Sequence, residues 1–460
     1  MIIPSFLHFY KKITCIYRQK GKLLDLDRIF WYNSSVMNEY YSVRKFHPKD
    51  TVTVSVPASK SITNRALLLA ALSRGTVTLT GGALSEDTRA FLNCLVALGI
   101  RVERRENTLL VFGCGGNIPE KRAAINVESA GTAARFLTVA LAFCGGDYML
   151  DASEQMKRRP MKEILDLLRE AGVQIECLEE ADRFPFRLRS GGITASSITA
   201  DTEKSSQYAS ALLMAAGALN HPFTLRLTGP RTHGSYIGIT LRLLTAFNVP
   251  FERKGDEIVV SPSDNPPAHY KIEPDVSGAC YFYALSLLFR TRVLVRGVQQ
   301  DSMQGDMKFL DLLKDKGVRF TQTDEGLLAD GRGVASFGGF DADMKDFSDQ
   351  ALTVAALAPF ATSETHIRNV GHIRLQECDR MQAITVNLNA LGVPAEISGD
   401  DIVIRPAPVR GGTVQTFGDH RVAMAFALIG LKTGNVTIEN PACCKKTFEN
   451  YFELLDELTE

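Results

Sequence analysis

Six stretches that are apolar on nearly all sides recur along the chain, each opened by a polar or glycine-containing cluster. The clusters are Ser59-Lys60-Ser61, Ser129-Ala130-Gly131, Ser205-Ser206-Gln207, Asp275-Val276-Ser277, Ser348-Asp349-Gln350 and Asp419-His420-Arg421. With Lys60, Gly131, Ser206, Ser277, Gln350 and His420 as markers, the spacings are 71, 75, 71, 73 and 70 residues. Spacing this regular predicts six copies of one structural unit, each with a helix that starts at its cluster.

A second helix is predicted in each of the first five units, where an apolar pattern ends in a turn and a strand follows. The residues at the turn are Gly99, Gly172, Asn248, Gly317 and Gly392. Glycine or asparagine at that place favours the left-handed cap of a helix C-terminus. Alternating runs such as 52–56 and 76–79 predict strands between the helices. The expected fold class is therefore α/β (α+β).

The helices that start at the clusters should be buried, because stretches such as 65–72 and 210–216 have no polar face. If they run alike in two groups of three, their N-termini emerge together. Unpaired N–H groups and the helix dipole make such N-termini suitable for phosphates and carboxylates. We therefore expect a site for anionic ligands where the polar clusters meet.

The two halves of the chain differ in chemistry. The first three clusters carry hydroxyl groups, glycine and lysine, whereas the last three carry Asp275, Asp349 and Asp419. We place the boundary near Pro274. The predicted N-terminal domain comprises residues 59–273, and the predicted C-terminal domain comprises 37–58 plus 274–460. Residues 1–36, aromatic and lysine-rich without a periodic pattern, are interpreted as a non-native or disordered extension ahead of Met37, with a targeting peptide as the alternative.

Composition limits the partners of the protein. Its 460 residues contain 52 basic and 52 acidic side chains, so no overall field attracts nucleic acid or an anionic membrane. Nine cysteines occur without a CxxC pair or a plausible metal site, which is typical of a reducing cytoplasm and predicts no bound metal. The longest strongly apolar stretch, 209–219, is shorter than the roughly 20 residues that span a bilayer.

The clusters of the N-terminal half have the composition of an oxyanion clamp. Residues 59–65 place three hydroxyls, an ammonium and a guanidinium in the first turns of one helix. Gly131 lets a ligand approach the backbone, and Arg135 follows one helical turn later. Ser205-Ser206-Gln207 adds hydroxyls and an amide. The alternative for each cluster is an ordinary helix cap with solvated charges.

Cations gather again in the C-terminal half. Arg380, Arg421 and Lys446 would surround one small dianion, since an arginine fork matches a carboxylate or phosphate at two points. Asp349 and Glu377 are then candidates for proton transfer. Surface salt bridges are the alternative for these charges. For His420 the alternative is a structural hydrogen bond.

Over roughly residues 40 to 460 the chain closely resembles the 3-phosphoshikimate 1-carboxyvinyltransferase family, also called EPSP synthase. The motifs that carry the resemblance are residues 57–72, Ala130-Gly131-Thr132-Ala133, Ser205-Ser206-Gln207, Glu377-Cys378-Asp379-Arg380, residues 419–425 and Lys446-Thr447-Phe448. The resemblance implies a two-domain enolpyruvyl transferase fold, with six βαβαββ repeats, three per domain, around buried parallel helices. It also implies transfer of the enolpyruvyl group of phosphoenolpyruvate to the 5-hydroxyl of shikimate 3-phosphate, without a metal or an organic cofactor.

The resemblance assigns roles to individual residues. The implied contacts of shikimate 3-phosphate are Lys60, Ser61, Arg65, Ser205, Ser206, Gln207, Tyr236 and Asp349. The implied contacts of phosphoenolpyruvate are Lys60, Gly131, Arg135, Gln207, Arg380, Arg421 and Lys446. The implied catalytic residues are Asp349, Glu377, Lys60 and His420. We expect a cytoplasmic monomer whose partners are these two substrates, with no nucleic acid and no membrane.

Four positions depart from the family pattern and are uncertain as ligands. They are Ser129, Gln155, His233 and Gln376, where Asn, Arg, Ser and Lys respectively are usual. Because the family's arginine at the second position touches phosphoenolpyruvate, we expect a neighbour, Lys157 or Arg158, to supply the missing charge.

Two other functions remain open at the level of sequence. The sister enzyme that transfers enolpyruvate to UDP-N-acetylglucosamine shares the fold but carries a reactive cysteine in a mobile loop, and the corresponding residues 151–160 contain none. A binding protein without catalytic activity is the second alternative, suggested by Gln155 and Gln376. Phosphate release from phosphoenolpyruvate in the presence of shikimate 3-phosphate distinguishes all three.

Overall fold

The computed structural model describes residues 39–460 apart from 83, 203–205, 230–231, 264 and the side chain of Ser206. Residues 39–460 form one compact unit. The predicted extension 1–36 lies outside the described residues.

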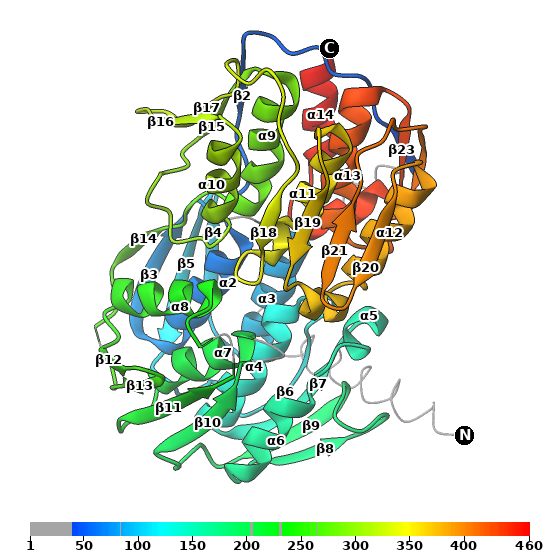
Figure 1. Ribbon diagram of the computed structural model, residues 1–460. Coiled ribbons are helices and arrows are strands. Elements are labelled where there is room, and N and C mark those ends of the chain that lie inside the picture. The colour runs from blue at the N-terminus through cyan, green and yellow to red at the C-terminus, as the bar shows by residue number, and fades with distance from the viewer. Residues whose placement is uncertain (1–38, 83, 203–205, 230–231, 264) are drawn as a thin grey trace. The chain divides into compact units, whose positions relative to one another are not determined.

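The strands form several short β-sheets in both halves of the molecule (Figure 1), and these sheets share a recurring strand order. In each four-stranded sheet two strands pair in parallel, and a hairpin continues the sheet in antiparallel pairing. Three such sheets come mostly from the N-terminal half, and the first has the strand order β14 (His269–Lys271), β3 (Arg74–Thr80), β5 (Thr108–Cys114) and β4 (Val102–Arg105). The second has the order β6 (Arg122–Asn126), β7 (Gly146–Asp151), β9 (Phe186–Ser190) and β8 (Gln174–Cys177). The third has the order β10 (Ser197–Asp201), β11 (Phe223–Thr228), β13 (Glu257–Val260) and β12 (Phe251–Lys254).

The C-terminal half contributes sheets of the same kind. Two are four-stranded, and the first has the strand order β2 (Thr51–Val54), β15 (Arg292–Arg296), β17 (Gly326–Asp330) and β16 (Arg319–Gln322). The second has the order β18 (Asp341–Asp343), β19 (Thr365–Arg368), β21 (Asp401–Ile404) and β20 (Ala395–Ser398). A three-stranded sheet comprises β22 (Gly412–Val414), β23 (Val436–Glu439) and β1 (Tyr40–Ser42). The mixed α/β class expected from the sequence is confirmed.

The helices that begin at the polar clusters are buried, as their sequences predict. They are α2 (Lys60–Leu72), α4 (Gly131–Cys144), α7 (Ser206–Ala216), α9 (Val276–Phe289), α11 (Ala351–Leu357) and α13 (His420–Thr433). In the fifth unit the cluster itself forms a 3-10 turn, η2 (Ser348–Gln350), ahead of α11. Such turns are common at helix N-termini, and this one moves the start of the α-helix beyond its cluster.

A second set of helices lies between the strands. They are α3 (Glu86–Ala97), α6 (Lys162–Glu170), α8 (Ser235–Ala246), α10 (Met307–Asp315), α12 (Arg380–Ala390) and α14 (Tyr451–Thr459), with the short α5 (Glu154–Lys157) before α6. The 3-10 turns η3 (Ala358–Phe360), η4 (Gly371–Leu375) and η5 (Pro441–Lys446) complete the elements. Gly99, Gly172, Asn248, Gly317 and Gly392 all have positive φ, which confirms the predicted left-handed caps.

Two hydrophobic cores form around the buried helices. One contains side chains of α2, α4 and α7, and the other contains side chains of α9, α11 and α13 together with Val52 and Val54 of β2. The chain crosses between the cores at two adjacent places, where Ser59 N donates to Glu273 O (2.8 Å) and Asp275 N donates to Pro57 O (2.7 Å). The helices α2 and α9 therefore start side by side. The division into domains at 59–273 stays a prediction.

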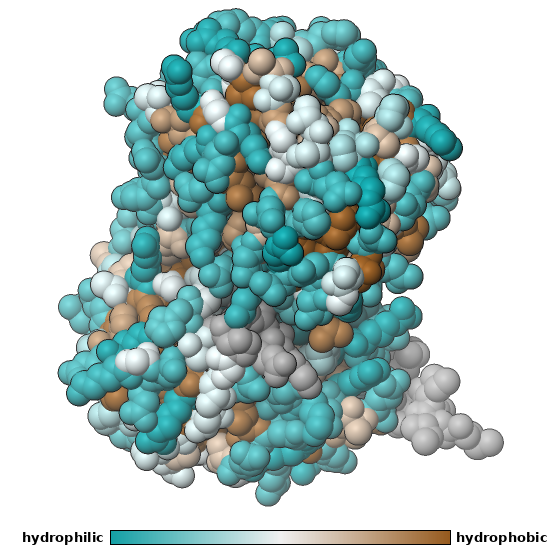
Figure 2. All heavy atoms as spheres, in the orientation of Figure 1, coloured by the Kyte–Doolittle hydropathy of each residue, from teal (hydrophilic) through white to brown (hydrophobic). Residues whose placement is uncertain are grey.

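Polar side chains cover most of the face shown in Figure 2, and hydrophobic ones appear there in small groups. No helix within the described ranges combines the length and apolar character that crossing a membrane requires. The eight cysteines of the described part are free of disulfide bonds.

A close approach of two backbones in the second core gives a test of the packing. Gly331, after β17, donates its N–H to Thr291 O (3.0 Å), and a Cβ at this position would collide with the Ser286 carbonyl of α9. Because backbone atoms cannot rotate away, Gly331→Ala should lower the free energy of unfolding by about 1–3 kcal/mol in chemical denaturation. Gly333→Ala, where the added atom meets nothing within 4 Å, is the matched control and should not destabilise. Equal stability of the two variants would contradict this packing.

Candidate active site

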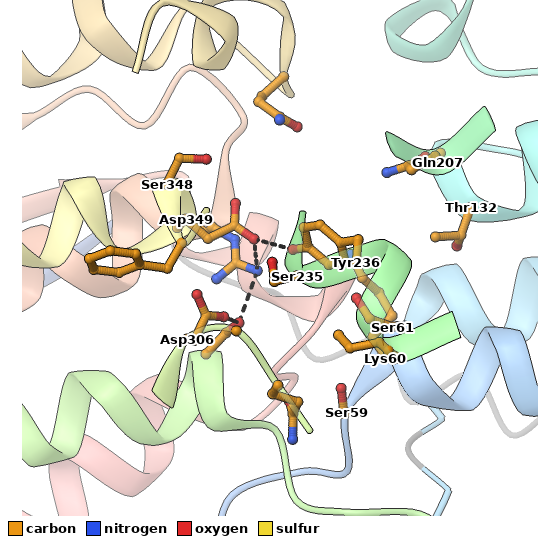
Figure 3. Close-up of a pocket in the computed structure, with 18 of the residues that line it drawn as sticks. Ser59, Lys60, Ser61, Thr132, Gln207, Ser235, Tyr236, Asp306, Ser348 and Asp349 are labelled. Atoms are coloured by element: carbon orange, nitrogen blue, oxygen red, sulfur yellow. Dashed lines mark hydrogen bonds and ion pairs between the residues drawn. The ribbon is translucent and has the colours of Figure 1, made fainter. Parts of the chain in front are cut away.

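A polar pocket collects the N-terminal ends of helices from both cores. Figure 3 shows Asp306, Ser348 and Asp349 on one side of it and Lys60 and Gln207 on the other. The residues expected from the sequence that line this pocket are Lys60, Ser61, Arg65, Gly131, Gln207, Tyr236, Asp349, Gln376, Glu377, Arg380, His420 and Arg421. Ser205 and the side chain of Ser206 lie outside the described residues.

Arg380, the first residue of α12, is the centre of the charge network. Its Nη1 lies 2.7 Å from Asp349 Oδ1, its Nη2 lies 2.9 Å from Glu377 Oε2, and its Nε lies 2.7 Å from Asp419 Oδ2. Asp419 is the N-cap of α13, where its Oδ1 accepts from the backbone N–H of Arg421 (2.8 Å). The Arg380 side chain is only 1% exposed, so these contacts fix three carboxylates from separate segments around one guanidinium.

Glu377 lies among three cationic side chains. Besides Arg380, its Oε1 lies 3.3 Å from Lys446 Nζ and 3.8 Å from Arg159 Nη1. Burial alone would raise the pKa of Glu377, but Lys446, Arg159 and Arg380 hold it well below its usual value. Without a ligand, Glu377 is therefore an ionised carboxylate that neutralises several cations.

Asp349 is held by groups from both cores. The Tyr236 hydroxyl donates to its Oδ2 (2.7 Å), and Arg421 Nη2 lies 3.0 Å from the same oxygen. Burial raises the pKa of Asp349, but Arg421 and Arg380 together with the Tyr236 hydrogen bond lower it to about 2. Asp349 is thus ionised and can accept a hydrogen bond from a hydroxyl group.

The cations of the N-terminal half are held differently. Lys60 Nζ lies 3.0 Å from Asp87 Oδ2. Arg65 is buried, and its nitrogens donate to Ser61 O (2.9 Å) and to the hydroxyls of Thr240 (2.9 Å) and Ser210 (3.2 Å). The Arg65 fork is therefore largely occupied by protein groups.

Arg135 lies behind the pocket wall. Its Nη1 donates to Gly131 O (3.1 Å) and Gln207 Oε1 (3.3 Å), so it links the starts of α4 and α7. Burial and, to a smaller extent, the neighbouring Arg159 lower the pKa of Arg135 to about 10. Lys446, at the end of η5, also lies beside the pocket, where its Nζ pairs with the pocket residue Glu377.

His420 is buried next to this network. Neither of its ring nitrogens has a hydrogen-bond partner in the described part of the chain. Burial lowers the pKa of His420 well below its ordinary value, although Glu377 opposes the shift. The imidazole is therefore neutral, and the alternative of a structural hydrogen-bonding histidine finds no partner among these residues.

The uncertain positions contribute little to the pocket, except Gln376, which lines it. Ser129 forms a hydrogen bond with Ser153 (2.7 Å between the hydroxyl oxygens), and Gln155 Nε2 donates to the backbone oxygen of Glu377 (3.4 Å). The side chain of His233 is 69% exposed.

Neither neighbour expected to replace the charge missing at Gln155 reaches the pocket. Lys157 pairs with Asp151, Glu154 and Glu179, and Arg158 is exposed to solvent. Local carboxylates hold Lys157 away, and Arg158 points outward from the turn after α5.

A second group of pocket residues was not expected from the sequence. Asp87 lies at the start of α3, Arg159 shortly before α6, Ser235 at the start of α8 and Asp306 directly before α10. All of them precede or open the second helix of a unit, as Glu377 does for α12. The regular spacing of the second helices indicates where Asp87 and Ser235 lie, at helix starts. Arg159 and Asp306 lie in turns ahead of their helices, which the spacing does not predict.

Asp306 has an unusual titration that can be measured. Its Oδ2 accepts a hydrogen bond from the Ser277 hydroxyl. Burial and the nearby Asp349 raise the pKa of Asp306 to about 7, with Asp275 adding to the effect and Arg421 opposing it.

Within the described residues, no group of three or more His, Cys, Asp or Glu side chains is arranged to hold a metal ion.

Asp306→Asn should therefore stabilise the protein above neutral pH. A carboxyl group whose pKa is raised to about 7 keeps its proton in the folded state, so stability falls as the pH rises from about 4 to about 7. The amide removes this loss, and the melting temperature should rise by a few degrees at about pH 8 and stay the same at about pH 4. Asp315→Asn, at an exposed position, is the control with no expected change. A gain that is the same at both pH values would contradict the shifted titration.

The chain is similar to known proteins over most of its length. The family model of EPSP synthase (3-phosphoshikimate 1-carboxyvinyltransferase) matches residues 49–455. A 3-phosphoshikimate 1-carboxyvinyltransferase of Trichormus variabilis is 37% identical over 404 residues, which cover 87% of this chain and 94% of the relative. One of Serratia proteamaculans is 38% identical over 420 residues, which cover 89% and 96%.

The fold is that of a solved structure as well. A 2.37 Å structure of EPSP synthase from Acinetobacter baumannii superposes with a TM-score of 0.75 at 22% identity, and the match covers 91% of this chain and 98% of the other. The family model and the curated relatives each span most of the chain. The chain belongs to the EPSP synthase (3-phosphoshikimate 1-carboxyvinyltransferase) family.

Proposed function

We propose that the chain transfers the enolpyruvyl group of phosphoenolpyruvate to the 5-hydroxyl of shikimate 3-phosphate and releases phosphate, a step on the way to chorismate and the aromatic amino acids. Membership of the family supports this activity. The observation that carries it is the network around Arg380, which holds two ionised carboxylates and several cations in one pocket. Two anionic substrates need those cations, and moving two protons needs those carboxylates.

Shikimate 3-phosphate occupies the side of the pocket formed by the N-terminal half. Its contacts are Lys60, Ser61, Arg65, Ser205, Ser206, Gln207, Tyr236 and Asp349. The Tyr236–Asp349 hydrogen bond, 2.7 Å long, supports this placement because it brings the two sides of the pocket together where the hydroxyl groups of the substrate would lie. Asp349 accepts the proton of the 5-hydroxyl as that oxygen attacks.

Phosphoenolpyruvate binds next to it among the cations. Its contacts are Lys60, Gly131, Arg135, Gln207, Arg380, Arg421 and Lys446. Arg380 and Lys446 both touch Glu377 in the free protein, so the negative charge of the substrate competes with that of Glu377 for the same partners. Lys60 and the neutral His420 lie beside the reacting atoms, where Lys60 stabilises the charge that develops in the transition state.

Glu377 donates a proton to C3 of phosphoenolpyruvate and later removes one from the same carbon. The free carboxylate is held ionised by three cations. When the substrate takes over some of these cations and adds its own negative charge, the pKa of Glu377 rises and the group can take up a proton. Glu377 then gives this proton to C3, and C2 becomes electron-deficient.

In the remaining steps Glu377 takes a proton back, and the proton of the 5-hydroxyl leaves with the phosphate. The 5-hydroxyl oxygen bonds to C2 while Asp349 takes its proton, and a tetrahedral adduct forms. The C2–O bond to phosphate then breaks, Glu377 takes one proton back from C3, and the double bond is restored. The proton on Asp349 leaves with the phosphate. We also propose that the protein acts as a monomer in the cytoplasm. The free cysteines of the described residues support the proposed compartment.

Phosphate release tests the activity. The purified full chain, mixed with phosphoenolpyruvate and shikimate 3-phosphate, should release phosphate, and omission of either substrate should abolish the release. UDP-N-acetylglucosamine in place of shikimate 3-phosphate should give none. Release only with the nucleotide sugar would show that the protein transfers enolpyruvate to UDP-N-acetylglucosamine instead. No release with either acceptor would indicate a binding protein without catalytic activity.

Asp349→Asn is the informative variant in this assay. The amide keeps the shape of the side chain but cannot accept the hydroxyl proton, so kcat should fall by about 10²–10⁴-fold. Asp315→Asn, an identical change at an exposed position of α10, should keep full activity. Full activity of Asp349→Asn would rule out its role as the base.

A further inference from the structure

Arg159 is a buried arginine that lines the pocket without an assigned role. It lies between α5 and α6, where its backbone N–H donates to Met156 O (3.0 Å) and so fixes the turn. The residue is only 8% exposed. A charged side chain is rarely buried to this extent without charged or hydrogen-bonding partners. The contacts of Arg159 therefore indicate its role.

Those contacts are few. Arg159 Nη1 lies 3.8 Å from Glu377 Oε1, at the outer limit of an ion pair, and Nε has no hydrogen-bond partner within the described ranges. Arg65 is the contrasting case, because three of its nitrogens donate to protein oxygens. Most of the N–H groups of Arg65 are therefore already used by the protein. The guanidinium of Arg159 instead keeps N–H groups available at the pocket.

A second guanidinium stands beside it. A Cβ built on Gly131 would lie 2.8 Å from Nη1 of Arg135 and 2.8 Å from Nη1 of Arg159, so both side chains flank the first residue of α4. Two guanidinium groups this close repel each other, and the positive end of the helix adds to the charge. Among the described residues, the carboxylate that pairs with Arg159 is Glu377, which is shared with Arg380 and Lys446. Positive charge is therefore in excess at this place.

We propose that Arg159 binds an anionic group of phosphoenolpyruvate, an inference that rests on the proposed function. The guanidinium offers two parallel N–H groups that match a carboxylate or a phosphate. On binding, the substrate anion replaces Glu377 as the partner of Arg159. The exchange removes one of the cations that keep Glu377 ionised, so Arg159 also helps to prepare Glu377 for protonation.

Three variants test this assignment in steady-state kinetics. Arg159→Gln should raise the KM for phosphoenolpyruvate by about tenfold or more, because a charge-assisted hydrogen bond in a buried site is lost, and should change the KM for shikimate 3-phosphate by less than about threefold. Arg159→Lys keeps the charge and should recover part of the affinity. Arg158→Gln removes the same charge from the exposed neighbouring position and should leave both KM values unchanged.

A merely structural role predicts other results. An unchanged KM for phosphoenolpyruvate in Arg159→Gln, or equal rises of both KM values together with a lower melting temperature, would overturn the proposal. If the parent protein releases no phosphate, the proposed function fails, and the anion site is then tested by calorimetry with inorganic phosphate. Weaker phosphate binding by Arg159→Gln than by Arg158→Gln would still support the site, whereas equal binding would refute it.

Discussion

The site depends on one buried guanidinium. Arg380 is almost inaccessible to solvent and pairs with Asp349, Glu377 and Asp419, which come from η2, the loop before α12 and the cap of α13. An unpaired charge at this depth would be severely destabilising, so Arg380 depends on these carboxylates. The network therefore fixes the relative positions of three chain segments. From the other core, Tyr236 contacts this network through its hydrogen bond to Asp349.

The network also explains how a pocket rich in charge remains stable without substrate. Glu377 pairs with Lys446 and Arg380 and lies near Arg159, so the cations that an anionic substrate needs are already held in place by a carboxylate. Preorganised charges of this kind need little rearrangement during the reaction. The same contacts keep Glu377 ionised until a substrate competes for its partners. Substrate binding and readiness for proton transfer thus follow from one exchange of ion pairs.

Sequence spacing predicted the starts of the buried helices, their burial and the left-handed caps, because these depend on local apolar patterns and on glycine. It did not predict which strands pair, since β2 joins β15 across more than two hundred residues and β14 returns to β3. Arg159 and Asp306 were missed because they lie in turns without periodicity. Lys157 was expected near the pocket, but local carboxylates hold it elsewhere. Motif spacing finds residues on helix starts, whereas loop residues require the tertiary structure.

The central claim is that substrate anions replace Glu377 at the cations around it. A crystal structure of the protein with shikimate 3-phosphate and an unreactive analogue of phosphoenolpyruvate tests this directly. The account predicts that Lys446 and Arg380 contact the analogue and that Lys446 has moved beyond the roughly 4 Å limit of an ion pair with Glu377. An analogue bound away from these cations, with the Lys446–Glu377 pair intact, would contradict it.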